Sequence, residues 1–210
     1  MESNKKKIII NVGRQIGSGG RIIAKMLADD LKCGFYDSEL LTLAAKESGF
    51  CEKLFEQHDE QKGFFNSLFH MHAPFVGDGN FYKNDFSQEG LFKIQSDTIR
   101  KLATEGSCVF VGRCADYVLR DFDNVVNVFI TADIEDRMAE IKKRKECSDE
   151  EARKVIENGE KSRSNYYNYY TGKKWGDSSS YDLCVNTSKL GLEATEAYIK
   201  EFIEKVLNIG

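Results

Sequence analysis

Residues 8–21 constrain the fold of this 210-residue chain more than any other segment. Residues 8–12 form a short, mostly β-branched apolar run, which is typical of a buried parallel strand. Four glycines follow between residues 13 and 20, and apolar residues then recur at helical spacing from Ile22 to Leu31. The segment therefore predicts a strand, a glycine-rich turn and a helix in direct succession.

This succession predicts an anion site. Glycine adopts positive φ without steric cost, so backbone N–H groups and a helix N-terminus can converge on one point. The turn departs from the phosphate-loop pattern G-x-x-x-x-G-K-[ST], because Gly20 and Arg21 stand where that pattern has lysine and a hydroxyl residue. Arg21, or Arg14 from the other side, could supply the positive charge, and Ser18 is the nearest hydroxyl for a metal ion. A glycine-rich turn without a ligand is the alternative.

Strand-like and helical segments alternate along the rest of the chain. Apolar runs typical of strands lie at residues 35–36, 108–111, 125–130 and 181–185. Helical patterns begin after Asp37, at Asp133 and at Ser148, and cover residues 90–103 and 193–207. This order predicts an α/β fold, with a mostly parallel sheet covered by helices on both faces.

The length suits one domain, residues 1–210. Residues 51–89 break the alternation, because their phenylalanines lie among Gly, Asn, Asp and His without a clean period. We therefore expect an inserted, partly mobile helical segment there. His70 and His72 lie within it as the only histidine pair, but positions so close together on a helix do not point the same way, so no metal site is expected there.

Composition excludes several classes of protein. A formal net charge of −4 argues against a nucleic-acid coating function, which needs many Lys and Arg. No run approaches the ~18 apolar residues of a membrane span, and the first residues lack the apolar core of a secretory signal. The six cysteines form no C-x-x-C pair, so no zinc ribbon or dithiol redox site is predicted. We expect a cytoplasmic protein with a small-molecule partner and no membrane partner.

A second group of candidate residues follows the strand at residues 108–111. Ligands of open α/β sheets bind at the carboxyl ends of the strands, where Arg113 and Asp116 would lie. Arg113 can hold a phosphate or carboxylate with two hydrogen bonds, and Asp116 can orient Arg113 or accept a bond from a base or sugar. A surface salt bridge at a helix start is the alternative.

A third group extends from Arg137 to Arg163 and into an aromatic run at residues 166–175. Arginines on a mobile flap could close on a transferring phosphoryl group, and Arg137, Lys161 and Arg163 are the candidates. Any single charge here can also simply face solvent. The aromatic run is expected to pack against the sheet or a subunit partner, which leaves a homodimer open.

The segments named so far resemble the cytidylate kinase-like family, a branch of the nucleoside monophosphate kinases. The resemblance covers nearly the whole chain and rests on GRQIGSGGRIIAKMLADDL with FYDSELL, CVFVGRCADYVL, VFITADIEDRMAEIKKR, and SRSNYYNYYTGKKWGD with YDLCVNTSKLGLEA. It implies a P-loop kinase fold with a five-stranded parallel sheet, ATP and Mg²⁺ as cofactors, and a nucleoside monophosphate or similar acceptor.

The resemblance also implies roles for individual residues. Residues 51–89 would be an acceptor-side insert and residues 137–176 a lid with the aromatic segment. Acceptor contacts are expected from Asp37, Arg113 and Asp116, and catalytic charge from Arg21, Arg137, Lys161 and Arg163. Nucleotide binding is expected from Gly13, Gly17, Ser18, Gly19, Gly20, Arg21 and Ile22, with Ser18 also reaching the magnesium ion.

The sequence therefore predicts an ATP-dependent phosphotransferase with an atypical phosphate loop. The absent lysine departs from the family pattern and leaves two other functions open. One is a nucleotide-binding regulatory module without turnover, and the other is a kinase for a hydroxyl group of a small metabolite.

Overall fold

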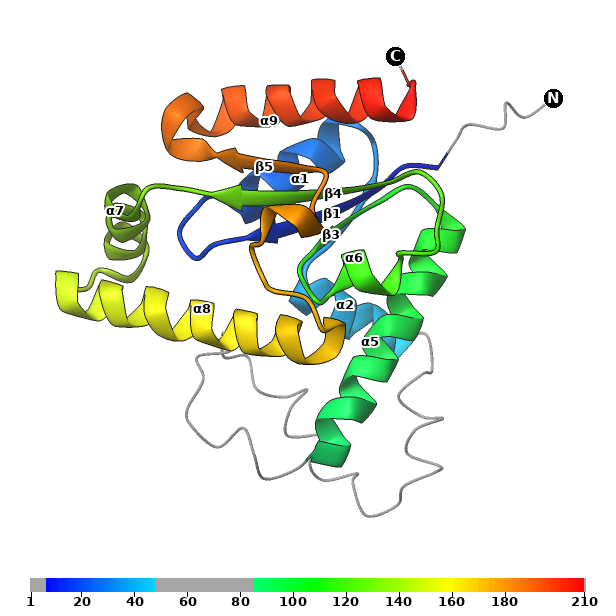
Figure 1. Ribbon diagram of the computed structural model, residues 1–210, viewed down its shortest axis with the longest axis horizontal. Helices are drawn as coiled ribbons and strands as arrows, with labels where there is room; N and C mark the ends of the chain where they lie inside the picture. The colour runs from blue at the N-terminus through cyan, green and yellow to red at the C-terminus, as the bar shows by residue number, and fades with distance from the viewer. Residues whose placement is uncertain (1–6, 48–84, 210) are drawn as a thin grey trace.

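The computed structural model describes residues 7–47 and 85–209 of the chain (Figure 1). Within these ranges, five parallel strands form one sheet in the order β2-β3-β1-β4-β5. The strands are β1 (Ile9–Arg14), β2 (Gly34–Tyr36), β3 (Cys108–Val111), β4 (Val125–Thr131) and β5 (Leu183–Asn186). The helices are α1 (Gly20–Asp30), α2 (Ser38–Glu47), α5 (Asp85–Glu105), α6 (Ala115–Val118), α7 (Ile134–Lys145), α8 (Asp149–Thr171) and α9 (Thr187–Leu207).

The central strand β1 pairs with β3 on one side and β4 on the other. Its Ile10 lies opposite Val109 of β3 and Val126 of β4, and all three side chains are fully buried. Burial on both faces explains why β1 is an apolar run rather than an alternating one. Asn11 is the polar exception, and its side-chain amide donates to Asn127 at 2.9 Å.

Helices cover both faces of the sheet, so the expected α/β class and parallel five-stranded sheet are confirmed (Figure 1). On one face, α1 and α9 pack against a cluster that includes Ile10 and Val12. On the other, α2, α5 and α6 pack against a cluster that includes Ile9 and Phe110. Because all strands run in the same direction, their carboxyl ends meet at one edge, beside α7 and α8.

Helices α7 and α8 form a pair with its own small core. Ile141 of α7 packs with Ala152 and Ile156 of α8, and all three are buried. A capping box starts α8: the Ser148 side chain accepts from the Glu151 N–H, and the Glu151 carboxylate accepts from the Ser148 N–H. The sequence predicted both helix starts, whereas the lid role of residues 137–176 stays a prediction.

Several element boundaries differ from the sequence-based expectation. Helix α8 continues through the aromatic run to Thr171 and ends at Gly172, whose φ of 68° suits glycine. Helix α5 begins at Asp85, earlier than expected. Helix α9 begins at Thr187, directly after β5, because the Asn186 side chain accepts from the Ser188 N–H and caps it, and Gly191 then interrupts the helix with a φ of 77°.

The expected insert lies outside the described residues except for residues 85–89, which belong to α5, so His70 and His72 are also outside. Within the described ranges, no helix has the length and apolar character needed to cross a membrane. Nor do the described residues contain a group of three or more His, Cys, Asp or Glu side chains placed to hold a metal ion.

Candidate functional site

The loop that joins β1 to α1, residues 15–19, needs glycine at two positions. Gly17 and Gly19 have φ values of 79° and 73°, in the left-handed region. A Cβ on Gly17 would lie 2.7 Å from the carbonyl oxygen of Arg137, and one on Gly19 would lie 2.4 Å from Leu192. Both glycines therefore let α7 and α9 approach the loop closely.

Hydrogen bonds hold the loop in place at the carboxyl edge of the sheet. The Gln15 N–H donates to the carbonyl of Ile130 at 3.0 Å, and the Gln15 side-chain oxygen accepts from Ala132 at 3.4 Å. Ser18 is only 2% exposed, and its hydroxyl donates to the Gln15 carbonyl at 3.0 Å. Ser18 is thus part of the internal bonding of the loop.

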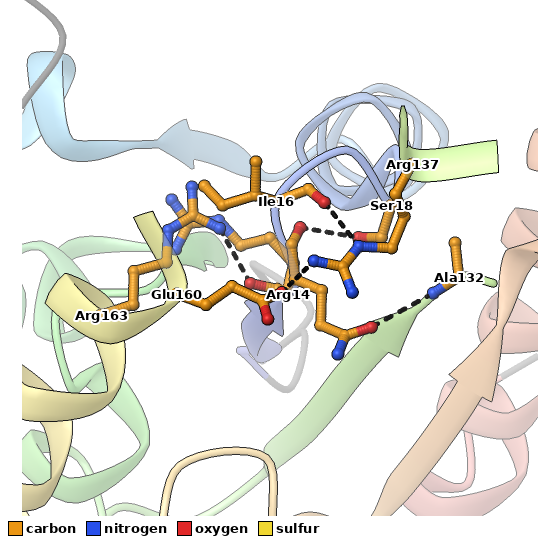
Figure 2. Close-up of polar contacts among 8 residues, drawn as sticks. Arg14, Ile16, Ser18, Ala132, Arg137, Glu160 and Arg163 are labelled. Carbon is orange, nitrogen blue, oxygen red and sulfur yellow. Dashed lines mark hydrogen bonds and ion pairs between the residues drawn. The ribbon is translucent and has the colours of Figure 1, made fainter. Parts of the chain in front are cut away.

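Arg137 of α7 fastens this loop to α8 (Figure 2). Its side chain is buried, and its Nε donates to the carbonyl of Ile16 at 2.8 Å. Its Nη2 forms an ion pair with Glu160 of α8. Because both ends of the guanidinium have partners, Arg137 holds the loop and the helix pair together.

Arg163 of α8 reaches the same loop from the other side (Figure 2). Its Nη1 donates to the carbonyl of Arg14 at 2.9 Å. Burial, together with the positive charge of Arg113 and other arginines, lowers the pKa of Arg163 to about 10. The nearby Glu160 acts in the opposite direction but does not cancel these effects.

The turn between β3 and α6 has three successive residues in the left-handed region. Gly112, Arg113 and Cys114 have φ values of 73°, 59° and 56°. This conformation costs about 1 kcal/mol or more for each residue with a Cβ, so the surrounding structure must impose it. The turn places the Arg113 guanidinium 5.8 Å from the centre of the Tyr166 ring.

Asp116, the other predicted residue of this turn, is buried and paired with a tyrosine. Its carboxylate accepts from the Tyr167 hydroxyl at 2.6 Å, and Tyr167 also stacks with Tyr181 at a centroid distance of 6.5 Å. Burial raises the pKa of Asp116, although the bond from Tyr167 and the charge of Lys173 oppose this rise. Burial and the Asp116 carboxylate together raise the pKa of Tyr167.

Replacing Tyr167 with phenylalanine is expected to lower the free energy of unfolding at neutral pH by about 1–3 kcal/mol, because it removes the side-chain donor of a buried carboxylate. Because the pKa of Asp116 is raised in the folded protein, Asp116 takes up a proton there as the pH falls through that pKa. Protonation removes the buried negative charge, and with it the cost of burying a carboxylate that lacks the Tyr167 hydroxyl. The deficit should therefore shrink as the pH falls. Urea denaturation at several pH values measures it, with exposed Tyr169→Phe as the control. A deficit that grows on acidification would contradict this account.

Asp37 follows β2 and is engaged on two sides. Its Oδ1 accepts from the N–H groups of Glu39 and Leu40, both at 3.1 Å, and so caps α2. Its Oδ2 forms an ion pair with Arg21 at 2.6 Å. Burial acts to raise the pKa of Asp37, but the bonds from Leu40 and Arg21 outweigh it and hold the pKa below its ordinary value.

The remaining predicted residues lie around the loop with different exposures. A Cβ on Gly13 would lie 2.7 Å from the Phe129 ring, so Gly13 allows close packing between neighbouring strands. Ile22 is 48% exposed on α1. Lys161 is exposed on α8, two residues before Arg163. The structure thus brings Arg113, Arg137 and Arg163 toward the loop. The functional roles that the sequence analysis assigned to these residues stay predictions.

Sequence reasoning did not assign Glu160, and it named Arg14 only as an alternative to Arg21. Glu160 precedes Arg163 by three residues on a helix, so the two share a face. A buried arginine such as Arg137 requires a carboxylate, but only the folded structure shows which one is in reach. Arg14 is partly buried, and its side chain lies against Gly20 and Gly112.

The strand order β2-β3-β1-β4-β5, with a glycine-rich loop after the central strand and helices on both faces, is that of the P-loop kinase fold. The chain belongs to the cytidylate kinase-like family, whose model matches residues 9–189. A cytidylate kinase from Pyrococcus horikoshii is 27% identical over 211 aligned positions, which cover 98% of this chain and 93% of that protein. A cytidylate kinase from Methanopyrus kandleri is 31% identical over 116 positions, or 51% of this chain and 60% of that protein.

Solved structures agree with this fold. An uncharacterized protein from Eubacterium ventriosum is 28% identical, with a TM-score of 0.72, and the match covers 94% of this chain and 99% of that one. A shikimate kinase from Bacteroides thetaiotaomicron is 14% identical, with a TM-score of 0.51, over 94% of this chain and 98% of that one. The second likeness concerns the fold alone.

Proposed function

We propose that the protein transfers the γ-phosphoryl group of ATP to a nucleoside monophosphate or a similar small acceptor. The observation that carries this proposal is the group of arginines beside the glycine-rich loop. Burial and the nearby charges of Arg163 and Arg113 lower the pKa of Arg14, and burial with the charge of Arg113 lowers the pKa of Arg163. Positive charge concentrated at the carboxyl edge of a parallel sheet suits a ligand with several phosphates.

Phosphoryl transfer requires positioning and charge more than covalent chemistry from the protein. The backbone N–H groups of the loop and the first turn of α1 would hold the phosphates of ATP. Arg163 would stabilise charge on the transferring group, with Lys161 approaching from the same helix. Arg137 would act through the loop it holds, because its guanidinium already binds Ile16 and Glu160.

The acceptor would lie on the side of the β3–α6 turn. Arg113 would bind its phosphate, while Asp116 and Asp37 would orient polar groups. An acceptor phosphate is already ionised, so the reaction needs no strong general base. The curated relatives are cytidylate kinases, which supports a nucleoside monophosphate as the acceptor.

The magnesium ion that accompanies ATP supplies charge neutralisation on the phosphates. Magnesium at such sites is held largely by phosphates and water, with one or two protein oxygens. Ser18, the metal ligand expected from the sequence, is only 2% exposed and its hydroxyl donates to the Gln15 carbonyl, so its oxygen would reach a metal ion only if the loop rearranged. None of the roles proposed here for the side chains depends on a metal ligand from the protein.

The test is phosphotransfer from ATP across a panel of nucleoside monophosphates and small hydroxyl metabolites, with thermal shift by ATP measured beside it. The same panel is run with Arg163→Gln and with Arg153→Gln, which removes an exposed arginine from the same helix. Turnover that Arg163→Gln lowers by ~10²-fold and Arg153→Gln leaves intact would support the proposal.

Each other outcome names a different function. Turnover only with a hydroxyl acceptor would identify a small-metabolite kinase. Stabilisation by ATP without turnover would favour the regulatory module, which the glycine at the lysine position supports. If the protein shows no turnover with any acceptor and ATP does not stabilise it, the assignment of the loop to nucleotide phosphates is overturned.

A further inference from the structure

Arg14, the last residue of β1, lies across the site at which phosphate loops carry a lysine. We propose that Arg14 replaces this lysine and, together with Arg113 and Arg163, binds the phosphoryl groups of the nucleotide. This inference rests on the function proposed above and assigns the loop cation that the sequence left open between Arg14 and Arg21.

The contact between Arg14 and Gly20 carries the first step. Gly20 is the first residue of α1, and its backbone has no left-handed φ, so its conformation does not require glycine. A Cβ at this position would lie 2.5 Å from the Cβ of Arg14 and 3.1 Å from its Cγ. The Cβ of residue 14 is fixed by the backbone, whereas the Cγ of Arg14 could turn away only by a change of side-chain rotamer. In this backbone, a residue with a Cβ at position 14 therefore leaves no room for a lysine at residue 20, and Arg14 is the cation that occupies the position.

The far end of the Arg14 side chain lies at the next strand. A Cβ on Gly112 would lie 2.3 Å from Nη1 of Arg14. The side chain thus extends from Gly20 at the start of α1 toward the turn after β3, along the carboxyl edge of the sheet. This course places its guanidinium beside the β3–α6 turn, at the residue that precedes Arg113.

Charge at this edge is unbalanced. The charged groups with the largest electrostatic effects on the pKa of Arg14 are three further arginines and one carboxylate: Arg21, Arg113, Arg163 and Asp37. Within residues 7–47 and 85–209, no carboxylate forms an ion pair with Arg14, and Asp37 is already paired with Arg21. Burial first, and then the charges of Arg163 and Arg113, lower the pKa of Arg14 well below its ordinary value. An anionic ligand would relieve this repulsion.

Arg21 is less suited to the role. Its side chain is 63% exposed, and its guanidinium binds Asp37 through both Nε and Nη2. A phosphate would have to compete with that carboxylate. Arg14 has no such competitor among the described residues.

A thermal-denaturation cycle tests the steric step without any ligand. Alanine near a helix start normally stabilises relative to glycine. We expect Gly20→Ala to lower the melting temperature of the wild-type protein by roughly 2–4 °C or more, and to raise it by about 2 °C in an Arg14→Gly background. The opposite sign in the two backgrounds is the signature of contact between the two side chains. Stabilisation by Gly20→Ala in the wild type would overturn the proposal.

Calorimetric titration with inorganic tripolyphosphate tests the binding step. We expect Arg14→Met to weaken binding by roughly tenfold or more, because it removes one oriented charge from the anion. Arg21→Met should weaken it less. The double variant Arg14→Gly/Gly20→Lys, which restores the ordinary lysine, should bind more tightly than Arg14→Gly alone.

The outcomes separate this inference from the function on which it rests. If the wild type binds tripolyphosphate and Arg14→Met binds it equally well, Arg14 is not the loop cation, whereas the kinase proposal survives. If Arg21→Met loses more affinity than Arg14→Met, Arg21 holds the role. If the wild type binds neither tripolyphosphate nor ATP, both proposals fail.

Discussion

Replacing Arg137 with methionine is expected to lower the free energy of unfolding by roughly 2–3 kcal/mol. The substitution leaves Glu160 partly buried without its partner and removes the bond to the Ile16 carbonyl. Methionine keeps much of the side-chain volume, so the loss reports the charge and its bonds rather than a cavity. Urea denaturation measures the change, and hydrogen exchange at residues 15–19 should quicken because the loop loses its attachment to α7.

Two further variants make this prediction specific. Arg153→Met removes an exposed arginine from α8 and should change stability by no more than about 0.5 kcal/mol. Arg137→Met/Glu160→Met removes both charges and should be more stable than Arg137→Met alone, because no unpaired carboxylate remains. Equal stability of Arg137→Met and the wild type would show that the pair does not hold the loop.

Arg113→Gly is expected to separate activity from stability. Phosphotransfer should fall by ~10²-fold or more, because the variant loses an arginine that we assign to the acceptor phosphate. The melting temperature should stay level or rise, because glycine adopts a φ of 59° without strain. This relief of strain offsets two costs, the greater entropy of glycine in the unfolded chain and the loss of the contact with Tyr166.

The control for backbone strain is Lys32→Gly. Lys32 also has a left-handed φ, 55°, but it is exposed and lies outside the proposed site. This variant should relieve strain to a similar extent while activity stays at the wild-type level. A marked fall in melting temperature for Arg113→Gly would mean that Arg113 is a structural residue, and its loss of activity would then carry no information on acceptor binding.

The sequence predicted the parts of the fold that depend on local pattern. The apolar run of β1 and the glycines after it predicted strand, turn and helix because each is encoded within a few residues. The capping box at Ser148 likewise marked the start of α8. The end of α8 was less visible, because tyrosines are neutral in a helix and the packing of Tyr170 against Phe92 of α5, at a centroid distance of 4.0 Å, is tertiary.

The candidate residues of the site came from the sequence, their pairings did not, and their roles stay predictions. The arginines at residues 113, 137 and 163 were identified as candidates, yet the partner of each depends on which helices meet at the edge of the sheet. No local pattern relates Arg137 to the carbonyl of Ile16, which lies 121 residues away. Gly20 was read as a missing lysine, whereas the contact with Arg14 gives a steric reason for the glycine.

Arg137 and Arg163 both hold the loop through main-chain oxygens, those of Ile16 and Arg14. Every amino acid carries such an oxygen, so these two hydrogen bonds do not depend on the side chains of the residues that accept them. The side chains that form this attachment are the two arginines, with Glu160 as the partner of Arg137. The side chain at residue 16 can therefore be exchanged, within the limits of its own packing, without loss of the hydrogen bond from Arg137.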